Sequence, residues 1–429
     1  MKFPVSFIFF VGGLALSSLS LHCLRFGVAW LAMRETGSAV VFAAIFGASS
    51  LVEIYSKPLL APLADYFERL AIVRACGALA TALAILLVLQ VLLLPFSLWL
   101  LALLLMVLSM VAALRDPASA GLVPNLVSAN QLTSALALRS TVASVSSLVG
   151  PMIGALLLAA GGIPTAMAAA VVASAAAVLL WFQMSTPKGE SASCPSRSAW
   201  PQYLSSWHLR MYDGLRAVFL TRAERMMALV VALTNAGLFP FFAVTLPLWV
   251  NRDLNSSPLM MGAMEAGFSI GILMGSLGGT RLLNARFGRY ATLIFGNGAL
   301  GAGLVAASVT RVPTFILVSM LVGGLGFSLF NINASWLRAA ATPDNFRSRM
   351  NAGVAFMSCF LNPFAAQCFG YSIEAVGAAA SVAASGTLIL VSTALLLLNK
   401  DLRVLLGLNE QAVVGIYAKL YPTAFANRR

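Results

Sequence analysis

The sequence predicts an all-α polytopic membrane protein with twelve transmembrane helices arranged as two six-helix bundles. Of its 429 residues, 60% are hydrophobic and 10% are charged, and the mean hydropathy is +0.91. Soluble domains carry about 25% charged residues. The apolar residues form twelve segments near the length of about 20 residues that a spanning helix needs. Lysine and arginine gather in alternate connections between these segments, as membrane topology requires.

The segments divide into six and six around a polar stretch. Residues 1–184 are expected to form the first bundle, 185–225 a cytoplasmic linker, 226–400 the second bundle and 401–429 a cytoplasmic tail. The first apolar segment continues to about Met33 without a convincing cleavage site, so we expect a spanning helix there rather than a signal peptide. The expected spans are residues 5–33, 38–60, 71–94, 97–114, 137–160, 164–184, 226–250, 258–283, 290–309, 313–336, 351–371 and 375–398.

The distribution of basic residues predicts the orientation. With both termini on one side, that side receives 23 of the 27 lysines and arginines, whereas Arg34, Arg252 and Arg311 fall on the other and Arg25 lies within the first helix. Basic residues favour the cytoplasmic side, so both termini are expected in the cytoplasm and the protein in the cell membrane. The net charge of +13 is dispersed in short clusters without interleaved aromatic residues, which argues against nucleic-acid binding.

The fifth segment contains Gly150-Pro151-Met-Ile-Gly154 within an apolar run. Proline removes a helical hydrogen bond, and glycines four residues apart lie on one face and let another helix approach closely. A kinked packing helix of any polytopic protein would also account for these residues.

Two further stretches accompany this motif, Ala61-Pro-Leu-Ala-Asp65-Tyr-Phe-Glu-Arg69 and Leu114-Arg-Asp-Pro-Ala118. Together the three resemble the major facilitator superfamily, and within it the branch of enterobactin-type siderophore exporters and macrolide-efflux proteins. The resemblance implies an antiporter motif at Gly150, Pro151 and Gly154, and a cytoplasmic latch formed by Asp65, Arg69 and Arg115.

The same resemblance implies an activity and leaves alternatives open. The expected activity is proton-coupled export of a small organic molecule, a siderophore or related natural product, by alternating access between two bundles. Macrolide or multidrug efflux is the alternative, and a non-transporting scaffold or sensor is a further one. The branch commonly has an acid midway along the first helix, where this chain has Leu21-His22.

Ionisable residues within spans are costly and are therefore candidates for function. Glu53 and Glu265 are the candidates for proton coupling, and Arg25, His22, Asn235 and Asn362 for substrate contact or charge pairing. Glu53 and Lys57 are four residues apart and can pair on one helix face. Arg25 and Glu265 lie at similar depths, which would also permit an ion pair. Structural ion pairs and hydrogen bonds between helices are the competing interpretation of all these residues.

No nucleophile elbow, phosphate loop or metal-ligand spacing is present in the sequence. The run Gly323-Gly-Leu-Gly326 lies inside a span and is expected to pack helices. We therefore expect no enzymatic activity, no cofactor and no metal. The expected partners are a small-molecule substrate, protons and the lipid bilayer, and the protein is expected to be a monomer.

Overall fold

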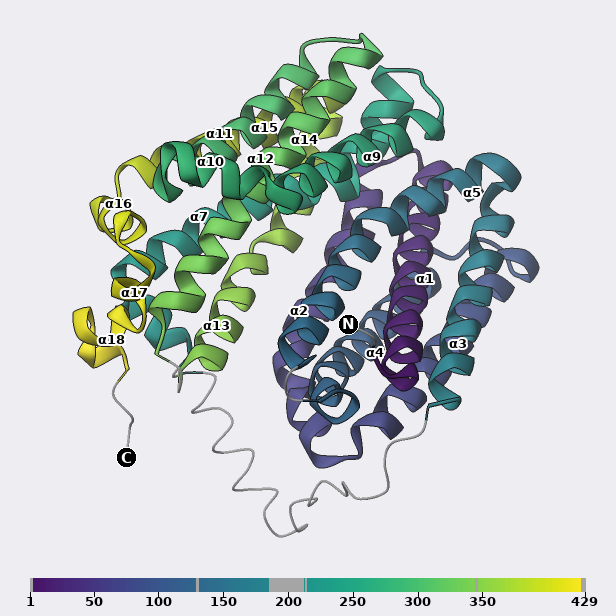
Figure 1. Ribbon diagram of the computed structural model, residues 1–429. Helices are drawn as coiled ribbons and strands as arrows, with labels where there is room; N and C mark the ends of the chain where they lie inside the picture. The colour runs from purple at the N-terminus through teal and green to yellow at the C-terminus, as the bar shows by residue number, and fades with distance from the viewer. Residues whose placement is uncertain (1–2, 129–130, 185–211, 213, 344–345, 426–429) are drawn as a thin grey trace. The chain divides into compact units, whose positions relative to one another are not determined.

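A computed structural model describes residues 3–128, 131–184, 212, 214–343 and 346–425 of the chain (Figure 1). All regular elements in these residues are helical, and eleven helices are long and apolar enough to cross a membrane. The chain divides into two compact units, Met1–Leu204 with Ser256–Gly262, and Ser205–Asn255 with Ala263–Arg429. The predicted fold class is confirmed.

The first unit is built from five long helical elements: α1 (Val5–Thr36), α2 (Ala39–Tyr66), α3 (Arg69–Leu93), α4 (Leu98–Leu126) and α5 (Leu132–Phe182). α5 is interrupted at Gly161 and Gly162, and Gly162 has φ +75°, a value that favours glycine. Its two legs correspond to the fifth and sixth predicted spans, which brings this unit to six helices. α4 continues to Leu126, beyond the end of the predicted span near Leu114, because Arg115 and Asp116 find partners within the unit, on Ser17 and Arg139.

Small residues allow α1 and α5 to pack closely. A methyl group added to Gly150 would stand 2.5 Å from Cβ of His22, and one added to Gly154 would stand 3.4 Å from Cα of Cys23. The Cys23 thiol donates a hydrogen bond of 3.1 Å to the Gly150 carbonyl oxygen. The two glycines of the predicted antiporter motif therefore lie directly against α1, with no room for a larger side chain at Gly150. Close approach of this kind is the usual role of small residues between membrane helices.

The second unit contains six spanning segments, several of them interrupted. The first joins α7 (Arg222–Pro240), a π-helical turn η3 (Phe241–Thr245), α8 (Leu246–Leu248) and η4 (Trp249–Asp253). Pro240 removes a backbone donor where the α-helical hydrogen bonding gives way to the π turn. The others are α9 (Pro258–Met274) with η5 (Gly275–Gly279) and α10 (Thr280–Phe287), α11 (Arg289–Ser308), α12 (Pro313–Ala341), α13 (Arg347–Cys359) with α14 (Asn362–Val376), and α15 (Ala378–Leu397).

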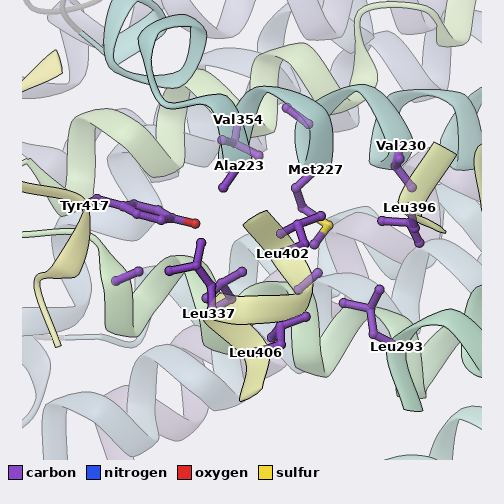
Figure 2. Packing of buried hydrophobic residues seen from close by; sticks show 14 of the residues in the cluster. Ala223, Met227, Val230, Leu293, Leu337, Val354, Leu396, Leu402, Leu406 and Tyr417 are labelled. Carbon is purple, nitrogen blue, oxygen red and sulfur yellow. The ribbon is translucent and has the colours of Figure 1, made fainter. Parts of the chain in front are cut away.

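The residues after α15 fold back onto the second unit as α16 (Lys400–Gly407), α17 (Glu410–Val413), α18 (Ile416–Leu420) and the 3-10 turn η6 (Pro422–Ala424). The Asn399 side chain caps α16 by accepting from the amides of Asp401 and Leu402. Leu402, Leu406 and Tyr417 pack into a buried cluster with residues of α7, α11, α12, α13 and α15 (Figure 2). We call this the tail cluster. It makes α16–α18 part of the packed unit.

A buried ion pair borders the tail cluster. Glu224, in the first turn of α7, is 1% exposed, and its Oε1 accepts a hydrogen bond of 2.5 Å from Nε of Arg338 on α12. The Tyr417 hydroxyl donates to the other carboxylate oxygen at 3.2 Å. Burial, and then the negative charge of Glu224, hold the pKa of Tyr417 well above its ordinary value. The hydroxyl therefore remains a donor at physiological pH, and Glu224 connects α7, α12 and α18.

Replacing Tyr417 with phenylalanine is expected to lower the stability of the second unit by about 1.5–3 kcal/mol, the range for hydrogen bonds to charged groups. The change leaves Glu224 buried with one oxygen lacking this donor while keeping the packing of the ring. Thermal unfolding of the detergent-solubilised protein would measure it. Tyr371→Phe is the matched control, because Tyr371 is 60% exposed. Equal unfolding temperatures for the two variants would contradict the expectation.

Candidate functional site

A charged cluster lies within the first unit, between α1, α2, α4 and α5. Arg25 on α1 is 4% exposed, and its Nη2 donates to Oε2 of Glu53 on α2 at 2.8 Å and to Oγ of Ser109 on α4 at 3.0 Å. Nζ of Lys57 lies 3.0 Å from Oε1 of Glu53, one helical turn away. Both oxygens of Glu53 are therefore engaged by a cation.

The cluster continues towards α5. Nζ of Lys57 also lies 3.5 Å from Oδ2 of Asp116 on α4, and Oδ1 of Asp116 accepts from Nη2 of Arg139 on α5 at 2.6 Å. The charges alternate along the series Arg25, Glu53, Lys57, Asp116, Arg139. Three cations face two carboxylates, so this five-residue cluster, which we call the charged relay, carries a net positive charge.

His22 lies one turn before Arg25 on α1 and faces Gly150 of α5. Arg25, Glu53 and Lys57 are close enough to act on it electrostatically. The structure therefore places His22 beside the charged relay.

Arg115 is buried next to the relay, but its hydrogen-bond partner is the Ser17 hydroxyl of α1 and its guanidinium lies 5.8 Å from the ring of Trp181. Its Nε has no hydrogen-bond partner within the described parts of the chain. A cavity of about 10 Å³ adjoins it, lined in part by Ser17, Ser20 and Ser174. This volume is about that of one water molecule.

The predicted latch is described only in part. Nη1 of Arg69 donates to the Gly121 carbonyl oxygen of α4 at 2.6 Å, which ties the start of α3 to α4. The side chains of Asp65 and Pro151 lie outside the described set, so the part of Asp65 in the latch and of Pro151 in the antiporter motif stay predictions.

Glu265 lies on α9 in the second unit and is 4% exposed. Its Oε2 has no hydrogen-bond partner among the residues that the structure describes. One turn further along α9, the Phe268 ring lies 4.8 Å from that of Phe242 and 6.0 Å from that of Phe327. Equal depth would permit Arg25 to pair with Glu265, but the acid that Arg25 contacts is Glu53.

The two candidate asparagines have different surroundings. Asn235 on α7 donates to the Ser358 carbonyl oxygen of α13 at 3.0 Å, a hydrogen bond between helices. Asn362, at the break between α13 and α14, is 6% exposed, and its Oδ1 has no partner in the described residues. Asn362 therefore keeps a buried acceptor at a helix break, where a ligand donor would satisfy it.

Sequence reasoning missed Asp116 and Arg139 in the first unit and a network around Asn297 in the second. Asp116 and Arg139 complete the charged relay, and the adjacent Arg115-Asp116 within an otherwise apolar helix was the signal for them. Asn297 on α11 donates to Ser392 Oγ and Thr393 Oγ1 of α15, both at 2.9 Å, and its Oδ1 accepts from Thr234 of α7 at 3.2 Å. This network joins three helices through partners that only the fold reveals.

Comparisons with known proteins agree with this architecture. The family model described as Major Facilitator Superfamily matches residues 7–248. The macrolide efflux protein A of Streptococcus pyogenes is 24% identical over 324 residues, covering 74% of this chain and 73% of that protein. A bacterial homologue of the human lysosomal transporter Spinster, in an inward-facing and occupied conformation, has a TM-score of 0.71 at 11% identity, covering 91% of this chain and 95% of that one.

The inward-open xylose transporter from E. coli has a TM-score of 0.67 at 12% identity, covering 96% and 99% of the two chains. At these identities the solved structures support the fold alone, whereas the family model covers more than half of the sequence. With its apolar helices in two units, the chain is a multi-pass membrane protein and a transporter of small molecules, and it belongs to the Major Facilitator Superfamily.

Proposed function

We propose that this protein exports a small organic molecule across the cell membrane by alternating access, in exchange for protons. The observation that carries the proposal is Glu265, a buried acid whose Oε2 lacks a hydrogen-bond partner in the described structure. A buried carboxylate without a compensating partner is costly. Such a group is suited to hold a proton when it is enclosed and to release it when water reaches it.

Glu53 is the less suitable of the two candidates for proton coupling. Its carboxylate is held by Arg25 at 2.8 Å and by Lys57 at 3.0 Å. Protonation of Glu53 would leave two cations without their shared acid, one of them buried. We therefore assign a structural role to Glu53 and the coupling role to Glu265.

The substrate proposed first is a macrolide or a similar apolar compound. The similarity to a macrolide efflux protein over three quarters of the chain supports it, as do the aromatic rings of Phe242, Phe268 and Phe327 near Glu265. An anionic siderophore is the second candidate, favoured by the net positive charge of the charged relay.

The proposed arrangement in the membrane follows from the basic residues. Both termini face the cytoplasm, the bundles formed by 1–184 and 226–400 move against each other, and the latch residues Asp65, Arg69 and Arg115 act on the cytoplasmic side. Gly150, Pro151 and Gly154 support the outward direction of transport, because they form the antiporter motif that the sequence resembles. The protein acts as a monomer.

Transport by Glu265→Gln in proteoliposomes tests the coupling. We expect substrate movement driven by an imposed pH gradient to fall at least about tenfold, the equivalent of 1.4 kcal/mol, because the amide cannot exchange a proton. Exchange of labelled for unlabelled substrate without a gradient should persist. Asp401→Asn is the matched control, since the Asp401 carboxylate lies on α16 outside the spans, is 39% exposed and pairs with Arg222.

The substrate is tested in cells lacking their own exporters, supplied with wild-type protein and with either a macrolide or a catecholate siderophore. Lower accumulation of one compound class in the cells that contain the protein identifies that class as the substrate. If Glu265→Gln retains gradient-driven transport, the coupling assignment is wrong; if neither class moves, the substrate assignment is wrong.

A further inference from the structure

A cavity of about 420 Å³ opens in the first unit, away from the charged relay. It lies where the end of α1, the turn between α3 and α4, and the Gly161–Gly162 break of α5 come together. Leu31, Phe96 and Leu101 contribute apolar walls, and Arg34, Glu35 and Gln90 contribute polar groups. Its volume falls within the range of small-molecule pockets, about 300–1,000 Å³.

Gln90 is the residue that makes this cavity a site. It lies in the last turn of α3 and is 3% exposed, yet its Oε1 has no hydrogen-bond partner among the described residues. Its Nε2 donates only a long hydrogen bond of 3.5 Å, to the Ser97 carbonyl oxygen. Buried acceptors are normally satisfied, and Gln90 lines the cavity, so a rotation of its side chain would bring Oε1 to a donor on the occupant.

An ion pair at the rim supplies both signs of charge. Nη2 of Arg34 lies 2.9 Å from Oε1 of Glu35, and both side chains are exposed, at 63% and 37%. An occupant carrying a positive and a negative group can therefore find an opposite charge for each. A purely anionic occupant would be repelled by the Glu35 carboxylate, and a purely cationic one would be repelled by the Arg34 guanidinium.

The surroundings of the cavity are those of a membrane interface. Leu92, Leu94 and Phe96 are 54%, 56% and 40% exposed, and Trp99, at the start of α4, is 84% exposed. Trp side chains concentrate at the boundary between lipid and water. Exposed apolar side chains next to a polar cavity at the helix ends suit a molecule with acyl chains and a polar headgroup.

We propose that this cavity binds the headgroup of a phospholipid with a primary ammonium group, phosphatidylethanolamine. The ammonium group donates hydrogen bonds to Oε1 of Gln90 and faces Glu35, the phosphate faces Arg34, and the acyl chains lie along Leu92 and Phe96. Phosphatidylcholine has the same charges but no N–H donor, so it cannot satisfy Gln90. None of the residues that line this cavity belongs to the charged relay.

Native mass spectrometry of the purified full chain, titrated with phosphatidylethanolamine, phosphatidylcholine or phosphatidylglycerol, tests the site. We expect wild type to prefer phosphatidylethanolamine over phosphatidylcholine by about fivefold, the effect of one hydrogen bond. Gln90→Leu should remove this preference, and Gln90→Glu, which keeps an acceptor, should retain it. Arg34→Gln should weaken the binding of both zwitterionic lipids to the same extent. Arg311 is an exposed cation of the other unit, so Arg311→Gln should leave the binding of both lipids unchanged.

The proposal is overturned by equal binding of the two zwitterionic lipids by wild type, by an unchanged preference in Gln90→Leu, or by tighter binding of phosphatidylglycerol than of phosphatidylethanolamine. Competition by soluble glycerophosphoethanolamine at the same concentration would also overturn it, because the apolar wall would then contribute nothing. If Gln90→Leu fails to fold, the lipid series on wild type and Gln90→Glu decides the outcome.

Discussion

Replacing Gly324 with alanine is expected to destabilise the second unit by about 3 kcal/mol or more, at or beyond the top of the range for overpacked sites. Gly324 lies on α12 against α9, and an added Cβ would stand 1.9 Å from the Phe268 carbonyl oxygen and 2.7 Å from its carbon. Backbone atoms cannot move aside as a flexible side chain can. The two helices must therefore separate, and the packing along their whole contact is lost.

Gly323→Ala is the matched control for this prediction. Gly323 is the preceding residue of the same helix and is also buried, but the nearest atoms to an added Cβ are side-chain carbons at 3.7 Å. The gain in helix propensity from glycine to alanine, about 0.5–1 kcal/mol, applies to both sites. Thermal unfolding and size-exclusion profiles of the two variants measure the difference, and equal unfolding temperatures would show that α9 and α12 do not meet at Gly324.

The change Glu53→Gln is expected to destabilise the first unit by about 3–5 kcal/mol, the range for breaking a buried ion pair. The Arg25 side chain is 5% exposed and would keep its charge without its acid. By contrast, Asp116→Asn removes the ion pairs to Lys57 and Arg139 from a side chain that is 48% exposed. We expect about 1 kcal/mol or less from that change, because solvent screens exposed pairs.

The double variant Arg25→Met with Glu53→Gln tests whether the broken ion pair causes this loss of stability. Removing both charges should restore most of the lost stability, since an apolar replacement of a buried pair is often neutral or stabilising. A double variant as unstable as Glu53→Gln alone would show that the loss arises elsewhere in the unit. Measuring pH-driven transport on the same proteins shows whether Glu53 has a role beyond stability.

The fold was largely predictable from the sequence because two physical constraints are local. The length of apolar segments and the side on which lysine and arginine gather can be read without knowing which helices touch. The errors occur where charges lie inside helices. The fourth span was expected to end near Leu114 because Arg115 and Asp116 follow, but α4 continues through both. Arg115 donates to Ser17 and lies over the Trp181 ring, and Asp116 accepts from Arg139.

The candidate site was predictable only where helix periodicity determines it. The Glu53–Lys57 pair follows from four-residue spacing and is present at 3.0 Å. Arg25 pairs with Glu53, and Asn297 pairs with Ser392 and Thr393, because of which helices are neighbours. A single sequence does not contain that information. The packed segment after α15 left a local signal in the spacing of Leu402, Leu405 and Leu406, which places three apolar residues on one face of α16.

The position of Tyr417 has a consequence for the order of assembly. Because synthesis proceeds from the N-terminus, α7 and α12 are complete long before α18 exists. During that interval the Glu224–Arg338 pair lacks its third partner, and Met227 and Leu337 lack part of their cover. The second unit therefore reaches its final packing only after α18 has been made, and until then a chaperone or protease that recognises exposed apolar side chains would find its target at this end of the unit.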